Sequence, residues 1–259
     1  PFFVIPTTSG TGSEATMVAV VSDTQKNVKL AFASYYLMPH AAILDPRMTQ
    51  TLPPHLTAMT GMDALTHCVE AYTCLAANPL SDAYASAGIK KISENLFKVL
   101  DNPSDAQGRL ELAQASTMAG IAFSNSMVGL VHSLGHALGA VAHLPHGLCM
   151  NLFLPYVLEY NKEVNGAKIG ELLLPLAGAD IYAQTPANLR TDKAIATLLT
   201  MRDRLFTLTK LPRTLRETGK VTEAQLDEVA EKALNDGSII YNPKEASLQD
   251  LRAILQKAW

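Results

Sequence analysis

The sequence predicts a short sheet-forming part followed by a longer all-α part. Residues 1–45 contain short β-branched or apolar runs separated by Gly, Ser, Thr, Asp, Asn and Pro, the pattern of strands and turns. From about Leu56 onward, apolar residues recur at spacings of three and four, the period of a helix with one buried face. Hydrophobic residues make up 48% of the 259 positions and charged residues 17%, a composition that builds a sizeable core and excludes intrinsic disorder.

The sheet-forming part is too small to be a fold of its own. Strands are expected over residues 3–5, 17–21, 29–32 and 41–44. Four short strands with no amphipathic helix between most of them cannot close a doubly wound sheet. We therefore expect missing strands upstream, in a longer polypeptide of which this sequence is the later portion. The segment 46–54, which begins and ends with proline, is the expected boundary between two domains, which would comprise residues 1–50 and 51–259.

The helical part is predicted by periodicity and by capping signals. Thr222 and Gln225 form a capping-box pattern that begins one helix, and Asn-Asp-Gly at 235–237 ends it. Ser247 and Asp250 begin the last helix in the same way. Six longer helices are expected over residues 56–77, 80–100, 106–128, 131–142, 151–161 and 189–208.

Charge and cysteine content restrict the classes of partner. The chain has 21 basic and 24 acidic residues, a net charge of −3, so it carries no basic footprint for nucleic acid or an anionic membrane. No run approaches the roughly 18 apolar residues of a spanning helix. Three cysteines without a CxxC pair indicate a reducing compartment, hence the cytoplasm. The apolar-rich composition predicts buried subunit surface and so a homo-oligomer.

Four of the seven histidines fall within fifteen residues: His132, His136, His143 and His146. His132 and His136 are four apart, so on a helix they share one face, with Cβ atoms about 5–6 Å apart. A single buried histidine is commonly a hydrogen-bonded core residue. Four in an apolar stretch without a neighbouring acid favour a metal site, but spacing alone does not decide which of them bind.

A second i, i+4 pair, Asp63 and His67, lies in an apolar helical stretch. An unpartnered carboxylate there would be costly to bury, so the pair is either a local hydrogen bond or part of a metal site. One such pair and two imidazoles from the histidine-rich segment make a mixed N/O donor set that suits Fe²⁺, Zn²⁺ or Co²⁺. A metalloprotease is set aside, because residues 132–136 lack the Glu of HExxH.

The segment 6–14, Pro-Thr-Thr-Ser-Gly-Thr-Gly-Ser-Glu, follows an apolar run. Its hydroxyl and backbone N–H groups are of the kind that hold phosphate or ribose oxygens. It is neither a Walker A motif nor a GxGxxG turn, and loops of this composition commonly have no ligand. Lys29 could add one positive charge, although a solvated lysine at a strand end is the alternative.

In order along the chain, these segments resemble the iron-containing (group III) alcohol dehydrogenases. The matching pieces are Thr-Thr-Ser-Gly-Thr-Gly-Ser-Glu at 7–14, Ala-Ile-Leu-Asp-Pro at 42–46, Gly-Met-Asp-Ala-Leu-Thr-His at 61–67 with Glu-Ala-Tyr at 70–72, His-Ser-Leu-Gly-His-Ala-Leu-Gly at 132–139, Pro-His-Gly at 145–147 and Asn-Pro at 242–243. The resemblance implies a fragment of a Rossmann-like nucleotide-binding α/β domain followed by an all-α, dehydroquinate synthase-like domain. It implies hydride transfer between a small primary alcohol or aldehyde and NAD or NADP.

The resemblance also implies residue roles. The metal, Fe²⁺ or Zn²⁺, would be held by Asp63, His67, His132 and His146. His136 would be the catalytic histidine beside substrate and nicotinamide. The resemblance gives His143 no role, and we interpret it as structural. The dinucleotide would be lined by Thr7, Thr8, Gly10, Thr11, Thr16 and Lys29.

Apolar walls for a small alcohol are expected at Met127, Val128 and Leu130. The family's Gly-Gly-Gly-Ser pyrophosphate loop is not in this sequence, so the choice between NAD and NADP is left open. Glycerol-dehydrogenase-like and dehydroquinate-synthase-like zinc enzymes, and a non-catalytic helical module stabilised by a metal, are the alternatives.

Overall fold

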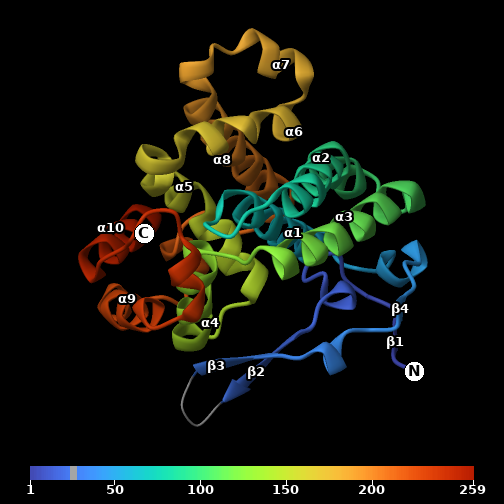
Figure 1. Cartoon of the computed structure of the whole chain (residues 1–259), viewed down its shortest axis with the longest axis horizontal. Helices are drawn as coiled ribbons and strands as arrows, with labels where there is room; N and C mark the ends of the chain where they lie inside the picture. Colours follow the sequence, from blue (N-terminus) through green and yellow to red (C-terminus); the bar gives the residue numbers. More distant parts are fainter. Residues whose placement is uncertain (24–27) are drawn as a thin grey trace.

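The computed structural model describes residues 1–23 and 28–259. Its helices form one body, and the N-terminal strands lie along one edge of that body (Figure 1). Strand β1 (Phe3–Val4) pairs in parallel with β4 (Ala41–Ala42), and β2 (Val18–Asp23) pairs antiparallel with β3 (Val28–Ala33). All four predicted strands are present, but the described residues place them in two separate two-stranded sheets rather than one.

The predicted helices are confirmed, most of them with small shifts at their ends. They are α1 (Pro54–Thr73), α2 (Pro79–Asp101), α3 (Ala106–Asn125), α4 (Leu130–Ala142), α5 (His146–Glu171), α8 (Arg190–Thr209), α9 (Leu226–Leu234) and α10 (Leu248–Ala258). Both predicted capping boxes form, at Thr222 and Ser247. Helix α5 is longer than predicted at both ends, and the short helices α6 (Leu173–Ala177) and α7 (Ala179–Gln184) were not predicted.

Helix α1 runs through the centre of the helical body and packs against α2, α3 and α5 (Figure 1). Most of its side chains are buried on all sides, including the polar residues Asp63, His67 and Glu70. Helix α4 packs against α5 and α9, and α9 in turn packs against α10. Polar side chains of α1 therefore lie in the interior of the helical body, which α4 and α5 also border.

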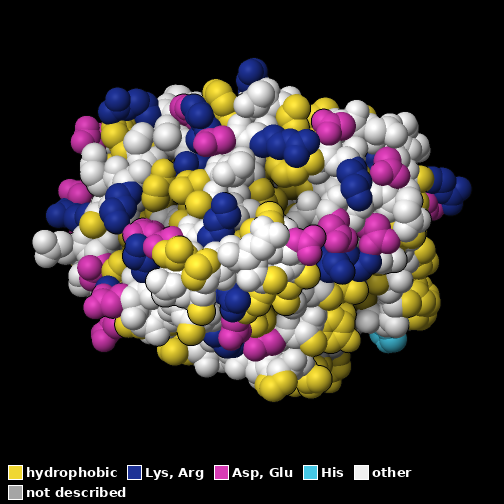
Figure 2. Space-filling view, turned by 90° about the horizontal axis from the view of Figure 1, so that it is seen from above, with side chains coloured by type: hydrophobic (Ala, Val, Ile, Leu, Met, Phe, Trp, Pro, Cys, Tyr) yellow, Lys and Arg dark blue, Asp and Glu magenta, His cyan; other side chains and the backbone are white. Residues whose placement is uncertain are grey.

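The surface carries charges of both signs. On the face seen from above the view of Figure 1, basic and acidic side chains are interspersed (Figure 2). Among the described residues, no helix combines the length and the apolar content needed to cross a bilayer.

The hydroxyl-rich loop at 6–14 is pressed onto helix α3. The Gly12 N–H donates to Ser116 Oγ at 3.1 Å, and the buried Glu14 carboxylate accepts from Thr117 Oγ1 at 2.7 Å. Gly12 has a left-handed backbone (φ 61°), and a Cβ built on it would lie 2.7 Å from the Cα of Gly120. At Gly12 and Gly120, between these side-chain hydrogen bonds, the loop and the helix meet backbone against backbone.

We expect Gly120→Ala to destabilise the protein by about 1–3 kcal/mol, because the new methyl group would overlap the Gly12 carbonyl oxygen and displace the loop. Urea unfolding measures the change. The control is Gly166→Ala in α5, where the new Cβ meets Thr191 at an ordinary 3.5 Å. Equal stability of Gly120→Ala and the parent would show that the contact is not tight.

Candidate active site

Three helices bring one aspartate and three histidines together. Asp63 and His67 lie one turn apart on α1, His132 lies in the first turn of α4, and His146 is the first residue of α5, after Pro145. One potential ligand atom from each of the four residues lies within 4.8 Å of the other three. Asp63, His67 and His132 are buried and His146 is partly exposed. The two distant segments singled out by the sequence therefore converge.

The cluster is close-packed and largely shielded from water. Asp63 Oδ1 lies 3.3 Å from His146 Nε2 and 3.9 Å from His67 Nδ1. The His67 ring stacks on Phe123 with centroids 4.6 Å apart and lies at the same centroid distance from His132. Burial, followed by the proximity of His132 and His136, holds the pKa of His67 well below its usual value. His67 is therefore neutral at pH 7, the form in which imidazole binds a metal.

The donor set fits a divalent transition metal. It consists of one carboxylate and three imidazoles without a thiolate, a combination that suits Fe²⁺ or Zn²⁺. Within the described chain the buried His67 Nδ1 has no hydrogen-bond partner. In a tetrahedral site with bond lengths of about 2.0–2.2 Å, ligand atoms stand about 3.3–3.6 Å apart. The four donor atoms here lie within 4.8 Å of one another, so binding of one cation would bring the most distant of them closer by about 1 Å.

Glu70 lies behind His132. Its Oε2 is 2.5 Å from His132 Nδ1, and its Oε1 accepts from the Val131 N–H at 2.7 Å. Burial raises the pKa of Glu70 to about 7, and backbone donors at Gly129, Val131 and His132 act in the opposite direction. The sequence comparison matched Glu70 without assigning it a role. Its spacing of three from His67 was the available signal, because that spacing places both side chains on one face of α1.

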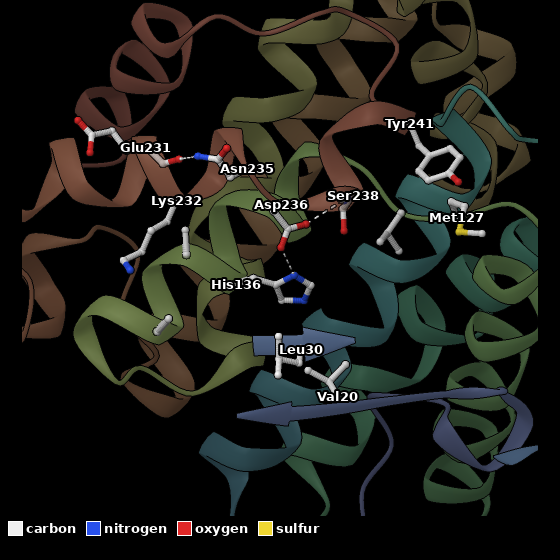
Figure 3. Close-up of a pocket in the computed structure, with 14 residues that line it drawn as sticks. Val20, Leu30, Met127, His136, Glu231, Lys232, Asn235, Asp236, Ser238 and Tyr241 are labelled. Atoms are coloured by element: carbon white, nitrogen blue, oxygen red, sulfur yellow. Dashed lines mark hydrogen bonds and ion pairs between the residues drawn. The ribbon is translucent and has the colours of Figure 1, made fainter. Parts of the chain in front are cut away.

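His136 lies one turn beyond His132 on α4, beside the cluster. Its ring stacks on that of His146, with centroids 5.4 Å apart. Its Nδ1 is 2.9 Å from Asp236 Oδ2, and Asp236 Oδ1 accepts from the Ser238 N–H at 2.8 Å (Figure 3). Burial raises the pKa of Asp236, but the hydrogen bond and charge of His136 and the Ser238 N–H outweigh it, so the pKa is lowered overall. Asp236 is therefore ionised at neutral pH.

Asp236 was missed by sequence reasoning. It caps the short helix Gly237–Tyr241, and its Asn-Asp-Gly context indicated only the end of α9. No local pattern links it to a histidine one hundred positions earlier.

A cavity of about 570 Å³ connects the cluster with the N-terminal part. His67, His132, His136 and His146 form one wall. The facing residues are Thr11, Ser13, Thr16, Met17, Val18, Val20, Phe32 and Ala33. The hydroxyl-rich loop and the β2–β3 hairpin therefore face the candidate metal centre across one space.

A second cavity, of about 610 Å³, meets the first at His136. It is lined by Val20, Leu30 and Met127 and by Asp236 and its neighbours, and the His136 ring lies between Asp236 and the hairpin (Figure 3). His136 therefore borders both spaces.

The other predicted residues vary in their placement. Thr11 and Thr16 line the first cavity, whereas Gly10 is buried against Thr60 of α1. Thr7 is exposed and Thr8 half-buried, and neither lines that cavity. The backbone of Lys29 lies in β3, and its side chain falls outside the described part of the structure. The predicted dinucleotide contacts of these residues stay predictions.

The structure also shows where the expected apolar walls and His143 lie. Met127 and Val128 line both cavities, as expected of apolar walls. Leu130 does not, because as the first residue of α4 it is wholly buried in the core. His143 is exposed with a left-handed backbone (φ 51°) at the end of α4, away from the cluster.

Comparison with known proteins gives matches over nearly the whole chain. A family model described as "Fe-containing alcohol dehydrogenase family, C-terminal" matches residues 57–259, and one described as "Iron-containing alcohol dehydrogenase" matches residues 1–46. The chain is 38% identical over 261 residues to alcohol dehydrogenase 4 of Saccharomyces cerevisiae and 38% identical over 259 residues to 1,3-propanediol dehydrogenase of Klebsiella pneumoniae. Both matches cover 100% of this chain and 65% of the relative.

The same similarity holds in three dimensions. The crystal structure of a 1,3-propanediol oxidoreductase superposes with a TM-score of 0.92 at 36% identity. That match covers 100% of this chain and 66% of the other. The chain thus spans 65% of the length of the two curated relatives and has the fold of the corresponding portion of the crystallised protein.

Proposed function

The chain belongs to the iron-containing alcohol dehydrogenase family, and from that membership we propose that it carries the metal centre and catalytic histidine of an NAD- or NADP-dependent alcohol dehydrogenase. The proposed reaction is reversible hydride transfer between a small primary alcohol, or its aldehyde, and the nicotinamide. The observation that carries this proposal is the cluster of Asp63, His67, His132 and His146, whose three histidines line one cavity together with His136.

Asp63, His67, His132 and His146 would hold one Fe²⁺ or Zn²⁺. When bound, the cation supplies Lewis-acid chemistry that favours the ionised form of an alcohol. Phe123, stacked on His67, together with Met127 and Val128, adds apolar surface to the cavity beside the cluster. The imidazoles of His67, His132 and His146 thus border a space suited to a short aliphatic chain.

His136 would accept the proton released by the alcohol. Because ionised Asp236 is an acceptor only, the hydrogen-bonded Nδ1 of His136 carries the ring hydrogen. Nε2 is then the basic atom available to the substrate. The second cavity, which His136 and Asp236 both line, offers the proton a route away from the cluster.

The dinucleotide would occupy the opposite wall. Thr11 and Thr16 present hydroxyl groups to the shared cavity, and Thr7, Thr8, Gly10 and Lys29 belong to the same N-terminal part. NAD and NADP both remain candidates. A cytoplasmic homo-oligomer without nucleic-acid or membrane partners also remains a prediction from composition.

The function is tested by following NADH and NADPH oxidation with aldehydes of two to four carbons, using the protein that carries this chain. We expect turnover after loading with Fe²⁺ or Zn²⁺, loss of turnover on chelation, and recovery on reloading. Metal bound at one ion per chain without turnover with either cofactor would favour a metal-stabilised helical module instead.

We expect Asp236→Asn to lower turnover by about 10- to 100-fold and to change its pH profile, while metal content stays unchanged. The amide no longer stabilises the ring with its hydrogen on Nδ1, so the proton-accepting atom is less well defined. Steady-state kinetics across pH and elemental metal analysis measure both effects. Asp227→Asn, in the exposed Asp227–Arg252 pair, is the matched control. Unchanged kinetics in Asp236→Asn would contradict a role in positioning His136.

A further inference from the structure

One buried carboxylate, Glu70, joins two helices that contribute to the metal centre. It projects from α1 and reaches the first turn of α4, where it contacts the Val131 N–H and the His132 ring. Its side chain is only 5% exposed and that of His132 only 3%. The Glu70 side chain thus connects α1 to the start of α4 through two buried contacts.

The start of α4 depends on this link. The N-terminal N–H groups of a helix have no partners within the helix and are commonly satisfied by a side chain at the N-cap position. Here the N-cap residue is Gly129, which provides no side-chain cap. Glu70 Oε1 accepts from Val131 instead, and a Cβ at Gly129 would lie 3.2 Å from that oxygen. Glu70 therefore occupies space that the glycine leaves open.

The same carboxylate determines the chemistry of the His132 ring. We propose that Glu70 is a positioning residue that holds His132 in the tautomer with hydrogen on Nδ1, so that Nε2 offers its lone pair to the metal. This inference rests on the metal centre proposed above. In its ionised form Glu70 has only acceptors, and Oε2 faces Nδ1. A cation held by His132 would favour that ionised form over the protonated carboxyl group. A histidine with hydrogen on Nε2 would face Glu70 with two acceptors and would have no lone pair for a cation.

Glu70→Gln tests this directly, because an amide has one acceptor and one donor end. If the amide oxygen accepts from Val131, the NH₂ group faces His132 Nδ1 and favours hydrogen on Nε2. If the amide is flipped, its NH₂ group faces the Val131 N–H, and two donors oppose each other. The substitution preserves shape and removes charge, yet it penalises the metal-binding tautomer in both orientations.

We expect Zn²⁺ affinity, measured by competition with a chelator, to fall by about 10- to 100-fold in Glu70→Gln. We also expect ¹⁵N NMR of histidine-labelled, metal-free protein to show His132 with hydrogen on Nδ1 in the parent and on Nε2 in the variant. Circular dichroism verifies that the variant is folded. The parent spectrum tests the proposal even if the variant fails to fold.

Glu14→Gln is the matched control. Glu14 is 4% exposed and, like Glu70, accepts a hydrogen bond, here from Thr117 Oγ1. A hydroxyl can also donate to an amide oxygen, and Glu14 does not contact the histidine cluster, so we expect unchanged Zn²⁺ affinity and an unchanged His132 tautomer. Loss of affinity in this control would show that losing any buried carboxylate has the same effect, and would overturn the assignment to Glu70.

The outcomes separate the inference from the proposed function. A parent chain that binds no Zn²⁺ contradicts the metal centre, while its NMR spectrum still reports the tautomer set by Glu70. A parent that binds Zn²⁺, with Glu70→Gln binding as tightly or with His132 keeping its hydrogen on Nδ1 in that variant, overturns the role of Glu70 alone.

Discussion

His132→Ala is expected to abolish stoichiometric metal binding and, with it, metal-dependent turnover. The change removes one of four donors and leaves the buried Glu70 without its imidazole partner. Structural four-ligand zinc sites bind with about 10–16 kcal/mol, so loss of one donor is expected to weaken binding by at least about 100-fold, enough for a competing chelator to remove the metal. Elemental analysis and chelator competition measure the loss. His146→Ala is expected to behave in the same way.

His143→Ala is the control for this prediction. His143 comes from the same four-histidine segment but is exposed at the end of α4, so its replacement should leave metal content unchanged. Stoichiometric metal in His132→Ala or His146→Ala, or metal loss in His143→Ala, would contradict the ligand assignment.

His136→Ala is expected to keep its metal and to lose turnover by about 100- to 10,000-fold, the usual contribution of a general base. His136 lies beside the cluster and is hydrogen-bonded to Asp236, so the four candidate donors remain in place. The measurement pairs elemental metal analysis with steady-state turnover of the same preparation.

Added imidazole supplies a further control for His136→Ala, because the two cavities that meet at this position leave room for it. Partial recovery of turnover is expected. A purified His136→Ala protein without metal would show that His132 and His136 had been assigned each other's roles.

The parts of this structure that could be predicted from sequence are those governed by local spacing. The three- and four-residue apolar period located the main helices, and the capping boxes at Thr222 and Ser247 located the start of the last two. The i, i+4 spacing placed Asp63 and His67 on one face of α1. Helices α6 and α7 were missed because each is at most six residues long, too short for a periodic pattern.

The parts that could not be predicted depend on pairing between distant segments. Strand positions were predicted, but not that β1 pairs with β4 while β2 and β3 form a separate hairpin. Spacing left His146 undecided, because only the start of α5 after Pro145 brings this residue to Asp63. Asp236 meets His136 only through packing of the α9 region on α4. Packing between distant segments produces no recognisable pattern within a short stretch of sequence.

The backbone contact between Gly12 and Gly120 has a dynamic consequence. Rotamer changes cannot loosen the point at which the backbones of Gly12 and Gly120 meet, so we expect the hydroxyl-rich loop and helix α3 to move together. A misplacement of about 1 Å between reacting groups can reduce a rate about 100-fold. A stiff contact of this kind would limit variation in the distance across the cavity between the hydroxyl-rich loop and the histidine cluster.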